Sequence, residues 1–310
     1  MKIGLLGFGT VGKGVYDIID QDFDDIFVKY VLVKHQEKHQ DIKSLLVDSI
    51  DDILSDDEIE VIIETIGGTD DAYEYVGKAL EKHKHVITAN KALISKHFNE
   101  LEKLASKHRV SLRYEASVGA AIIIIDPLKT IRDYNHIYQI EGIINGSTNY
   151  ILSKIFLDNY KLEDALKEAH QLGYIESNPK DDMDGFDLLR KIHILSQIAY
   201  QEDIDTNMIK RIPLSSITQE DIDTVKKQDK IIKYIASSKK DGSKIEIEVK
   251  PIIIDKTHPY AAINYEDNII HVFGEYHKKQ TFIGTGAGRY PTASAIIYDL
   301  LKIKATNEKP

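Results

Sequence analysis

The chain has 310 residues, of which 42% are hydrophobic and 29% charged, an ordinary globular composition with room for two domains. Its net charge of −10 argues against a general nucleic-acid or anionic-membrane surface, because both need a basic face. With no cysteine, disulfides, thiolate metal sites and a cysteine nucleophile are excluded, and we expect a cytoplasmic protein.

No stretch of the sequence predicts a membrane anchor or a signal peptide. The N-terminus is apolar, but glycines at positions 4, 7 and 9 interrupt it. The longest apolar run, residues 118–125, is far below the ~18 residues needed to cross a bilayer. We therefore expect neither a membrane nor a nucleic acid as partner.

Short apolar runs alternate with helical patterns over the first third of the chain. Strands are expected at residues 3–6, 28–33, 61–65, 85–89 and 111–114. Helices are expected between them, because apolar residues such as Val11, Val15 and Ile18 share one helical face. Strands that alternate with helices form a parallel sheet. The fold class is therefore α/β, with a Rossmann-type, doubly wound nucleotide-binding domain over residues 1–130.

The pattern changes from about residue 135. Residues 219–244 are polar but keep apolar residues at helical spacing, so we interpret them as solvated helix and turn. The mixture of elements predicts an α+β substrate domain over residues 131–284. Its strands are expected at 136–145, 245–254, 269–273 and 280–283, and its helices at 147–158, 161–172 and 185–201.

A glycine-rich sequence follows the first expected strand directly and opens the first expected helix. Its glycines permit a tight turn, close approach of the backbone to a pyrophosphate, and close packing of helix on strand. The phosphates then lie at the positive helix end, where N–H groups lack partners. Glycine turns alone are common, but this placement predicts a dinucleotide site formed by Gly7, Phe8, Gly9, Thr10, Val11 and Gly12.

The second expected strand ends near Val33, where an acidic residue would bind the ribose 2′-hydroxyl of NAD. The residues that follow are Lys34, His35 and Gln36, and Glu37 is the first acid. Because a cation suits the 2′-phosphate of NADP, we predict that NADP is preferred over NAD. The alternative is that Lys34 lies in an ordinary solvated turn.

Motifs that cover nearly the whole chain resemble, in their order, those of the homoserine dehydrogenase family. They lie at residues 64–68, 86–93, 114–119, 142–150, 172–191 and 284–295, and the most specific is LGYIESNPKDDMDGFD. The resemblance implies NAD(P)-dependent interconversion of L-homoserine and L-aspartate 4-semialdehyde, in threonine, methionine and isoleucine biosynthesis. It also implies that residues 285–310 complete the nucleotide-binding domain and that the substrate domain forms a homodimer.

Asp187 and Lys191 are four residues apart on an expected helix and so project from one face. Taken alone, such a pair is an ordinary surface salt bridge, worth about 0.3–0.5 kcal/mol. An acid-rich loop precedes it, however, with Glu176, Asp181, Asp182 and Asp184. Because a site for an amino acid needs carboxylates for the ammonium and a cation for the carboxylate, this stretch is a candidate substrate site.

The resemblance assigns roles to individual residues. The implied catalytic residues are Lys191, which exchanges the proton of the substrate oxygen, Lys91, a second lysine near the reacting centre, and Asp187. The implied substrate-binding residues are Glu176, Asp187, Asp182, Tyr174, Gly146 and Ser147. Further cofactor contacts are implied at Thr65, Lys91, Gly173 and Gly286.

The family also binds a monovalent cation, Na⁺ or K⁺, at a loop whose matching positions are Glu115, Val118, Ala120 and Ile122. Family members often carry glycines and a proline where this chain has Ala120, Ala121 and Ile123. These three departures change the loop whose geometry the resemblance implies for the cation site. Zinc is not implied, because the 12 histidines show no tight ligand spacing.

Many family members carry a further C-terminal domain that senses threonine. This chain ends about 15 residues after its last motif, too few for a domain of ~50 residues, so we expect no response to threonine. Two other readings remain open: a reductase of a different semialdehyde or 2-oxo acid, and a non-catalytic NADPH sensor. Activity on homoserine discriminates among the three.

Overall fold

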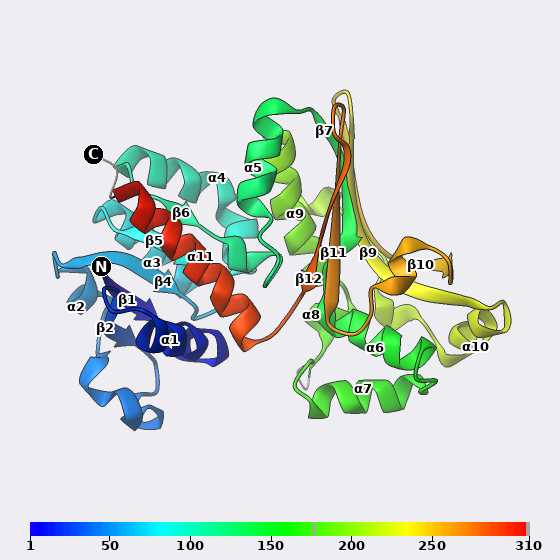
Figure 1. The fold of residues 1–310 in the computed structure, drawn as a ribbon, viewed down its shortest axis with the longest axis horizontal. Coiled ribbons are helices and arrows are strands. Elements are labelled where there is room, and N and C mark those ends of the chain that lie inside the picture. The colour runs from blue at the N-terminus through cyan, green and yellow to red at the C-terminus, as the bar shows by residue number, and fades with distance from the viewer. Residues whose placement is uncertain (176–177, 308–310) are drawn as a thin grey trace. The chain divides into compact units, whose positions relative to one another are not determined.

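The chain divides into two compact units (Figure 1). The first contains Met1–Ile123 and Gly288–Pro310, and the second contains Ile124–Ala287. The computed structural model describes residues 1–175 and 178–307. Helix α5 (Ile125–Tyr134) lies wholly in the second unit, so a domain boundary at residue 130 would cut through it.

The sheet of the first unit is parallel throughout and doubly wound, which confirms the expected fold class. The strand order is β3-β2-β1-β4-β5-β6, so the winding reverses between β1 and β4. Ligands bind such sheets outside the carboxyl ends of the strands at this reversal. The strands are β1 (Lys2–Leu6), β2 (Phe27–Leu32), β3 (Leu46–Val47), β4 (Ile59–Glu64), β5 (His85–Thr88) and β6 (Leu112–Arg113).

Helices connect these strands, and the last helix of the chain returns to the same unit. Ala293, Ile296 and Leu300 of that helix are fully buried against Leu5 and Val15. Because apolar burial is worth about 25 cal/mol per Å², this packing ties the C-terminal segment to the nucleotide-binding sheet. The helices of the unit are α1 (Thr10–Asp22), α2 (Ile50–Leu54), α3 (Asp70–Glu81), α4 (Lys91–His108) and α11 (Arg289–Asn307).

The second unit contains a mixed sheet with helices, as expected for an α+β domain. Its strand order is β12-β11-β7-β9-β10-β8, and its pairs are antiparallel except β10 with β8. The strands are β7 (Ile137–Ile143), β8 (Lys210–Arg211), β9 (Lys230–Asp241), β10 (Lys244–Asp255), β11 (Asp267–Gly274) and β12 (Lys278–Thr285). The helices are α5, α6 (Gly146–Phe156), α7 (Leu162–Gln171), α8 (Lys180–Met183), α9 (Phe186–Tyr200) and α10 (Gln219–Lys227).

The interpretation of residues 219–244 as solvated helix and turn is wrong for its second half. α10 is helical, but β9 is a strand between β7 and β10 in the middle of the sheet. The polar residues of β9 include a buried one: Lys233 is 2% exposed and donates to Asn149 Oδ1 at 3.0 Å and Asn264 Oδ1 at 3.1 Å. Burial lowers the pKa of Lys233 to about 8. A lysine buried in this way makes a core strand look like a solvent-exposed segment when only the sequence is considered.

Among residues 1–175 and 178–307, none of the helices combines the length and apolar character that a membrane crossing needs.

Candidate active site

The expected pair on α9 forms and is buried. Gly185, in the left-handed conformation with φ of 80°, precedes the first residue of the helix. Lys191 Nζ lies 3.0 Å from Asp187 Oδ2, and the side chains are 10% and 2% exposed. An ordinary surface salt bridge would leave both groups in water. Because a buried ion pair is costly to desolvate, this geometry indicates a site and not a solvated helix face.

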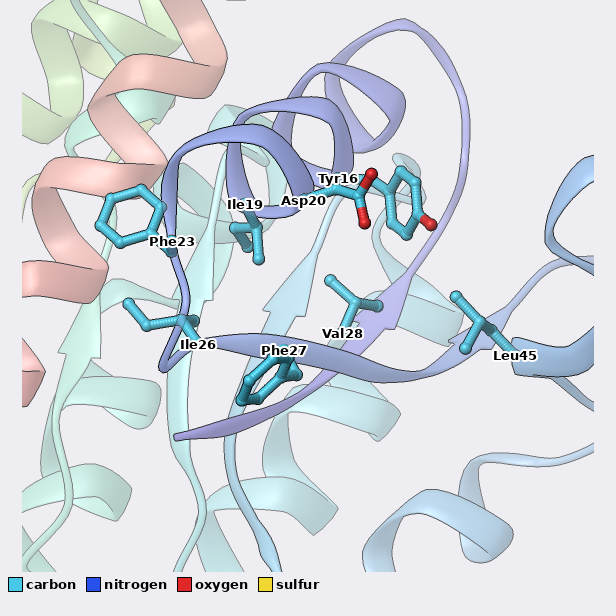
Figure 2. A pocket seen from close by; sticks show the side chains of 8 residues that line it. All are labelled: Tyr16, Ile19, Asp20, Phe23, Ile26, Phe27, Val28 and Leu45. Atoms are coloured by element: carbon cyan, nitrogen blue, oxygen red, sulfur yellow. The ribbon is translucent and has the colours of Figure 1, made fainter.

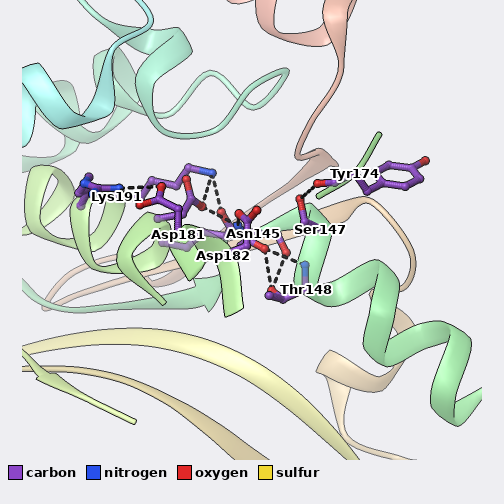
Figure 3. A network of polar contacts seen from close by, with 10 residues as sticks. Asn145, Ser147, Thr148, Tyr174, Asp181, Asp182 and Lys191 are labelled. Carbon is purple, nitrogen blue, oxygen red and sulfur yellow. Dashed lines mark hydrogen bonds and ion pairs between the residues drawn. The ribbon is translucent and has the colours of Figure 1, made fainter. Parts of the chain in front are cut away.

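Asn145, the last residue before α6, holds the pair from the other side. Its Nδ2 donates to Asp187 Oδ2 at 2.8 Å and to Asp182 Oδ1 at 2.7 Å (Figure 3). Its Oδ1 caps α6 by accepting from Thr148 N at 2.7 Å, and Lys191 Nζ donates to Ile144 O at 2.8 Å. The junction of β7 with α6 therefore fixes both the lysine and two carboxylates.

The start of α6 also meets the loop that follows α7. Ser147 Oγ donates to Tyr174 O at 2.6 Å (Figure 3), and the Tyr174 ring stacks on Tyr150 with centroids 4.3 Å apart. Burial and the Glu266 carboxylate raise the pKa of Tyr174, so its hydroxyl stays protonated. These contacts bring Gly146, Ser147 and Tyr174 together, whereas Glu176 lies outside the described residues.

The glycine-rich turn of the first unit has backbone features typical of a dinucleotide site. Gly7 has φ of 92°, and a Cβ on Gly12 would lie 2.3 Å from Gly7 O, so the turn is too tight for any side chain there. A Cβ on Gly9 would meet no described atom within 4 Å. α1 begins after Gly9 without a side-chain cap, so the cap residue leaves the first N–H groups of the helix for a pyrophosphate to bind.

Thr65 and Lys91 follow the carboxyl ends of β4 and β5, the edge at which the glycine-rich turn lies. Thr65 Oγ1 donates to Leu6 O at 3.0 Å and to Gly7 O at 3.2 Å. Lys91 is the first residue of α4, whose cap is the Asn90 side chain accepting from Leu93 N at 3.0 Å. Lys91 belongs to the first unit and Lys191 to the second.

Gly173 and Gly286 lie in the second unit, apart in sequence from the glycine-rich turn. Gly173 has φ of 78° and faces open space, since a Cβ there would meet no described atom within 4 Å. Gly286 N donates to Glu266 O at 2.9 Å, and a Cβ on Gly286 would clash with Asn268. Both positions thus depend on the absence of a side chain.

The expected cation loop is a buried turn of the first unit. Glu115, Val118, Ala120 and Ile122 are each at most 6% exposed. Ala120 has φ of 50°, which explains why glycine suits this position. Glu115 N donates to Asp299 Oδ2 at 2.9 Å. Burial raises the pKa of Asp299 to about 7, although the Arg113 guanidinium opposes the shift. Within the described residues, no three His, Cys, Asp or Glu side chains gather to hold a metal.

A separate cavity of about 220 Å³ opens between α1 and β2 (Figure 2). It lies at the amino end of β2, where Phe27 begins the strand, and the glycine-rich turn lies at the carboxyl end. None of the residues expected to bind cofactor or substrate lines it. Its lining is formed by Tyr16, Ile19, Asp20, Phe23, Ile26, Phe27, Val28 and Leu45.

Comparison with known proteins identifies the family. The homoserine dehydrogenase family profile matches residues 124–301, and the profile of the homoserine dehydrogenase NAD-binding domain matches residues 7–115. The homoserine dehydrogenase of Bacillus subtilis is 37% identical over 315 residues, which cover 98% of this chain and 72% of that protein. The chain belongs to the homoserine dehydrogenase family.

Solved homoserine dehydrogenases have the same fold. The enzyme from Thiobacillus denitrificans has a TM-score of 0.92 and 32% identity, covering 99% of this chain and 74% of that one. A putative homoserine dehydrogenase from Archaeoglobus fulgidus has a TM-score of 0.87 and 27% identity, covering 98% of this chain and 99% of that one. The resemblance stated from the motifs is confirmed. Homoserine dehydrogenases are NAD(P)-dependent oxidoreductases, so the chain is an enzyme with a nicotinamide cofactor and a small-molecule substrate.

Asn145 is the residue of this homoserine dehydrogenase site that the sequence analysis missed. It lies within the motif at residues 142–150, in which the sequence analysis assigned no role to the asparagine. A signal was present, since asparagine directly before a helix and after a strand is a typical N-cap. What the cap pattern did not indicate is that the same amide would reach two carboxylates on α8 and α9.

Proposed function

We propose that this chain interconverts L-homoserine and L-aspartate 4-semialdehyde. The observation that carries the proposal is the buried Lys191–Asp187 pair, held by Asn145 beside Asp182. This group combines a cation that can exchange a proton with carboxylates that can bind an ammonium. Both are needed for an amino acid that carries a reacting alcohol.

Substrate binding is proposed to use both ends of the amino acid. Asp187 and Asp182, together with Glu176, bind the ammonium through charge-assisted hydrogen bonds. The Gly146-Ser147 turn opens α6, whose N-terminus favours a carboxylate, and Tyr174 lies against Ser147. The substrate would thus be oriented along the junction of β7 with α6.

Proton transfer is proposed to occur at Lys191 Nζ. In the oxidative direction the alcohol O–H bond breaks and its proton goes to the lysine amine, while the carbon–hydrogen bond is cleaved. The nicotinamide cofactor, when bound, takes up the hydride. Lys91 adds positive charge near the oxygen that becomes the carbonyl, and Asp187 fixes the position of Lys191. A lysine serves this purpose because its neutral form is accessible, unlike that of arginine.

The cofactor is proposed to lie along the glycine-rich turn, Gly7 to Gly12, with Thr65, Lys91, Gly173 and Gly286 completing its site. NADP is preferred because Lys34 follows β2, where the 2′-phosphate of the ribose is recognised in such folds. Lys34 is 81% exposed and pairs with Asp71 at 2.9 Å. Its ammonium is accessible to a ligand that approaches the carboxyl edge of the sheet.

Replacing Lys34 with alanine is expected to weaken NADPH binding about tenfold, because a charge-assisted hydrogen bond to the phosphate is lost. NADH binding should stay nearly unchanged. Titration of nicotinamide fluorescence with the purified variant measures both dissociation constants. The matched control is Lys82→Ala. Lys82 is an exposed lysine of the same unit that follows the C-terminal end of α3, whereas Asp71, the partner of Lys34, lies at the N-terminal end. Equal weakening of both cofactors by Lys34→Ala would contradict a contact with the 2′-phosphate.

A monovalent cation, Na⁺ or K⁺, is proposed at Glu115 and the carbonyls of Val118, Ala120 and Ile122. The buried carboxylates of Glu115 and Asp299 share this turn with one guanidinium, Arg113. Carboxylate and carbonyl oxygens are the ligands that such hard cations take.

A homodimer through the second unit is also proposed. Several large apolar side chains of that unit are exposed, and burial against a second copy of the chain would remove them from water. They include Ile212 at 51%, Ile253 at 56%, Tyr276 at 71% and Ile283 at 60%. Sedimentation of the purified chain tests this proposal.

One assay tests the proposed activity. L-homoserine is added with NADP or NAD, and reduction of the cofactor is followed by its absorbance; L-serine, shorter by one methylene, is the control substrate. We expect reduction with homoserine and much less with serine. Activity with another alcohol in place of homoserine would indicate a different reductase. Cofactor binding without any reduction would indicate a sensor.

A further inference from the structure

An NAD site usually has an acidic residue directly after β2, and this chain has none at that place. A carboxylate from another element of the fold, α3, lies there instead. Asp71, the second residue of α3, accepts a hydrogen bond from Lys34 Nζ at 2.9 Å. The two residues are 37 positions apart. No inspection of the residues around Lys34 could have indicated this carboxylate.

The Lys34–Asp71 pair lies at the edge of the sheet where a dinucleotide ribose is recognised. Gly7 N donates to Leu32 O at 2.9 Å, which places the end of β2 against the glycine-rich turn. β4 pairs with β1 on the other side, and the short loop after β4 leads into α3. Gly67 and Gly68 of this loop have φ of 70° and 73° and would each carry a Cβ into open space. α3 thus begins beside the cofactor turn.

A carboxylate at this place has opposite effects on the two cofactors. The 2′-phosphate of NADP is repelled by Asp71 and must replace it as the partner of Lys34. The 2′-hydroxyl of NAD carries no charge and can donate to the same carboxylate. The pair is exposed, with side chains 81% and 52% accessible, so Lys34 can exchange one partner for another.

We propose that Asp71 is a specificity-determining residue, which limits the preference for NADP and keeps NAD acceptable. The proposal rests on the proposed cofactor contact of Lys34. The hydrogen bond that Lys34 donates to Asp71 also raises the pKa of Lys34, so Lys34 is charged while it pairs with Asp71. Because the pair is exposed, its effect on binding is screened by salt.

Asp71→Asn tests this inference, because asparagine keeps the shape and removes the charge. At low ionic strength the dissociation constant of NADPH should fall about threefold, a magnitude typical of an exposed charge. That of NADH should stay the same or rise. Asp70→Asn is the matched control: Asp70 is the neighbouring residue, 93% exposed, and lies 3.8 Å from Lys96 instead of Lys34. It should leave the ratio of the two constants unchanged.

The ratio of the NADPH to the NADH dissociation constant decides the outcome. A fall of at least twofold for Asp71→Asn, absent in Asp70→Asn, supports the proposal; an unchanged or rising ratio, or an equal fall in both variants, overturns it. The fall should also shrink in high salt. If the wild-type chain bound neither cofactor, the proposed function would fail as well. Failure of the ratio test alone leaves the proposed activity standing.

Discussion

Replacing Lys191 with alanine is expected to lower kcat about 10²–10⁴-fold, equivalent to roughly 3–5 kcal/mol of barrier. The reason is that water replaces the amine poorly as a proton acceptor in a site where the lysine is only 10% exposed. The dissociation constant of NADPH should be unchanged, since Lys191 is not among the proposed cofactor contacts. Steady-state kinetics with homoserine, together with cofactor titration, measure both quantities.

Lys191→Arg separates proton transfer from simple charge. Arginine keeps the positive charge beside Asp187 but does not release its proton near neutral pH. We expect this variant to be nearly as slow as Lys191→Ala. Lys210→Ala, an exposed lysine of the same unit with its side chain 74% accessible, should keep normal activity. Near-normal turnover of Lys191→Arg would contradict proton transfer by Lys191 and would show that the residue supplies only positive charge.

Replacing Asn145 with alanine is expected to lower both stability and substrate affinity. The variant loses the cap of α6, worth about 1 kcal/mol, and leaves Asp182 and Asp187 with one fewer donor each, which costs about 1–3 kcal/mol more. The free energy of unfolding should therefore fall by roughly 2–4 kcal/mol. KM for homoserine should rise more than kcat falls, because the amide contacts the two carboxylates directly and the proton acceptor only through Asp187.

Denaturant unfolding and steady-state kinetics check this expectation. Asn207→Ala is the control, since Asn207 is exposed in the same unit and its side chain bonds only locally, to Asp205 at 2.9 Å. It should cost less than about 0.5 kcal/mol. Full stability of Asn145→Ala, with unchanged KM, would show that the two carboxylates are held without the amide.

The nucleotide-binding unit was predictable because its signals are local. A buried parallel strand is a short apolar run, and a glycine-rich turn between strand and helix has few uses. The expected strands are present, and β3 was missed because two residues carry no periodicity. The second unit was harder. β9 lies between two antiparallel strands and contains the buried Lys233. Its sequence is therefore polar, although the strand belongs to the core.

Several properties of the site were determined by the sequence itself. The spacing of Asp187 and Lys191 places them one helical turn apart in any α-helix, and the order of the motifs is characteristic of one family. These conclusions need only local geometry and the kinds of residue present. They predicted the family, which is confirmed; the site residues and their roles stay predictions.

Only the tertiary structure decided the environment of those residues. Whether Asp187 and Lys191 are a solvated pair or a buried one depends on what packs over α9, and Asn145 reaches them from 42 positions away from Asp187. Asp71 reaches Lys34 across 37 positions in the same way. Burial and electrostatic pairing depend on which segments the fold brings together, and those distances in space are not encoded in any local pattern.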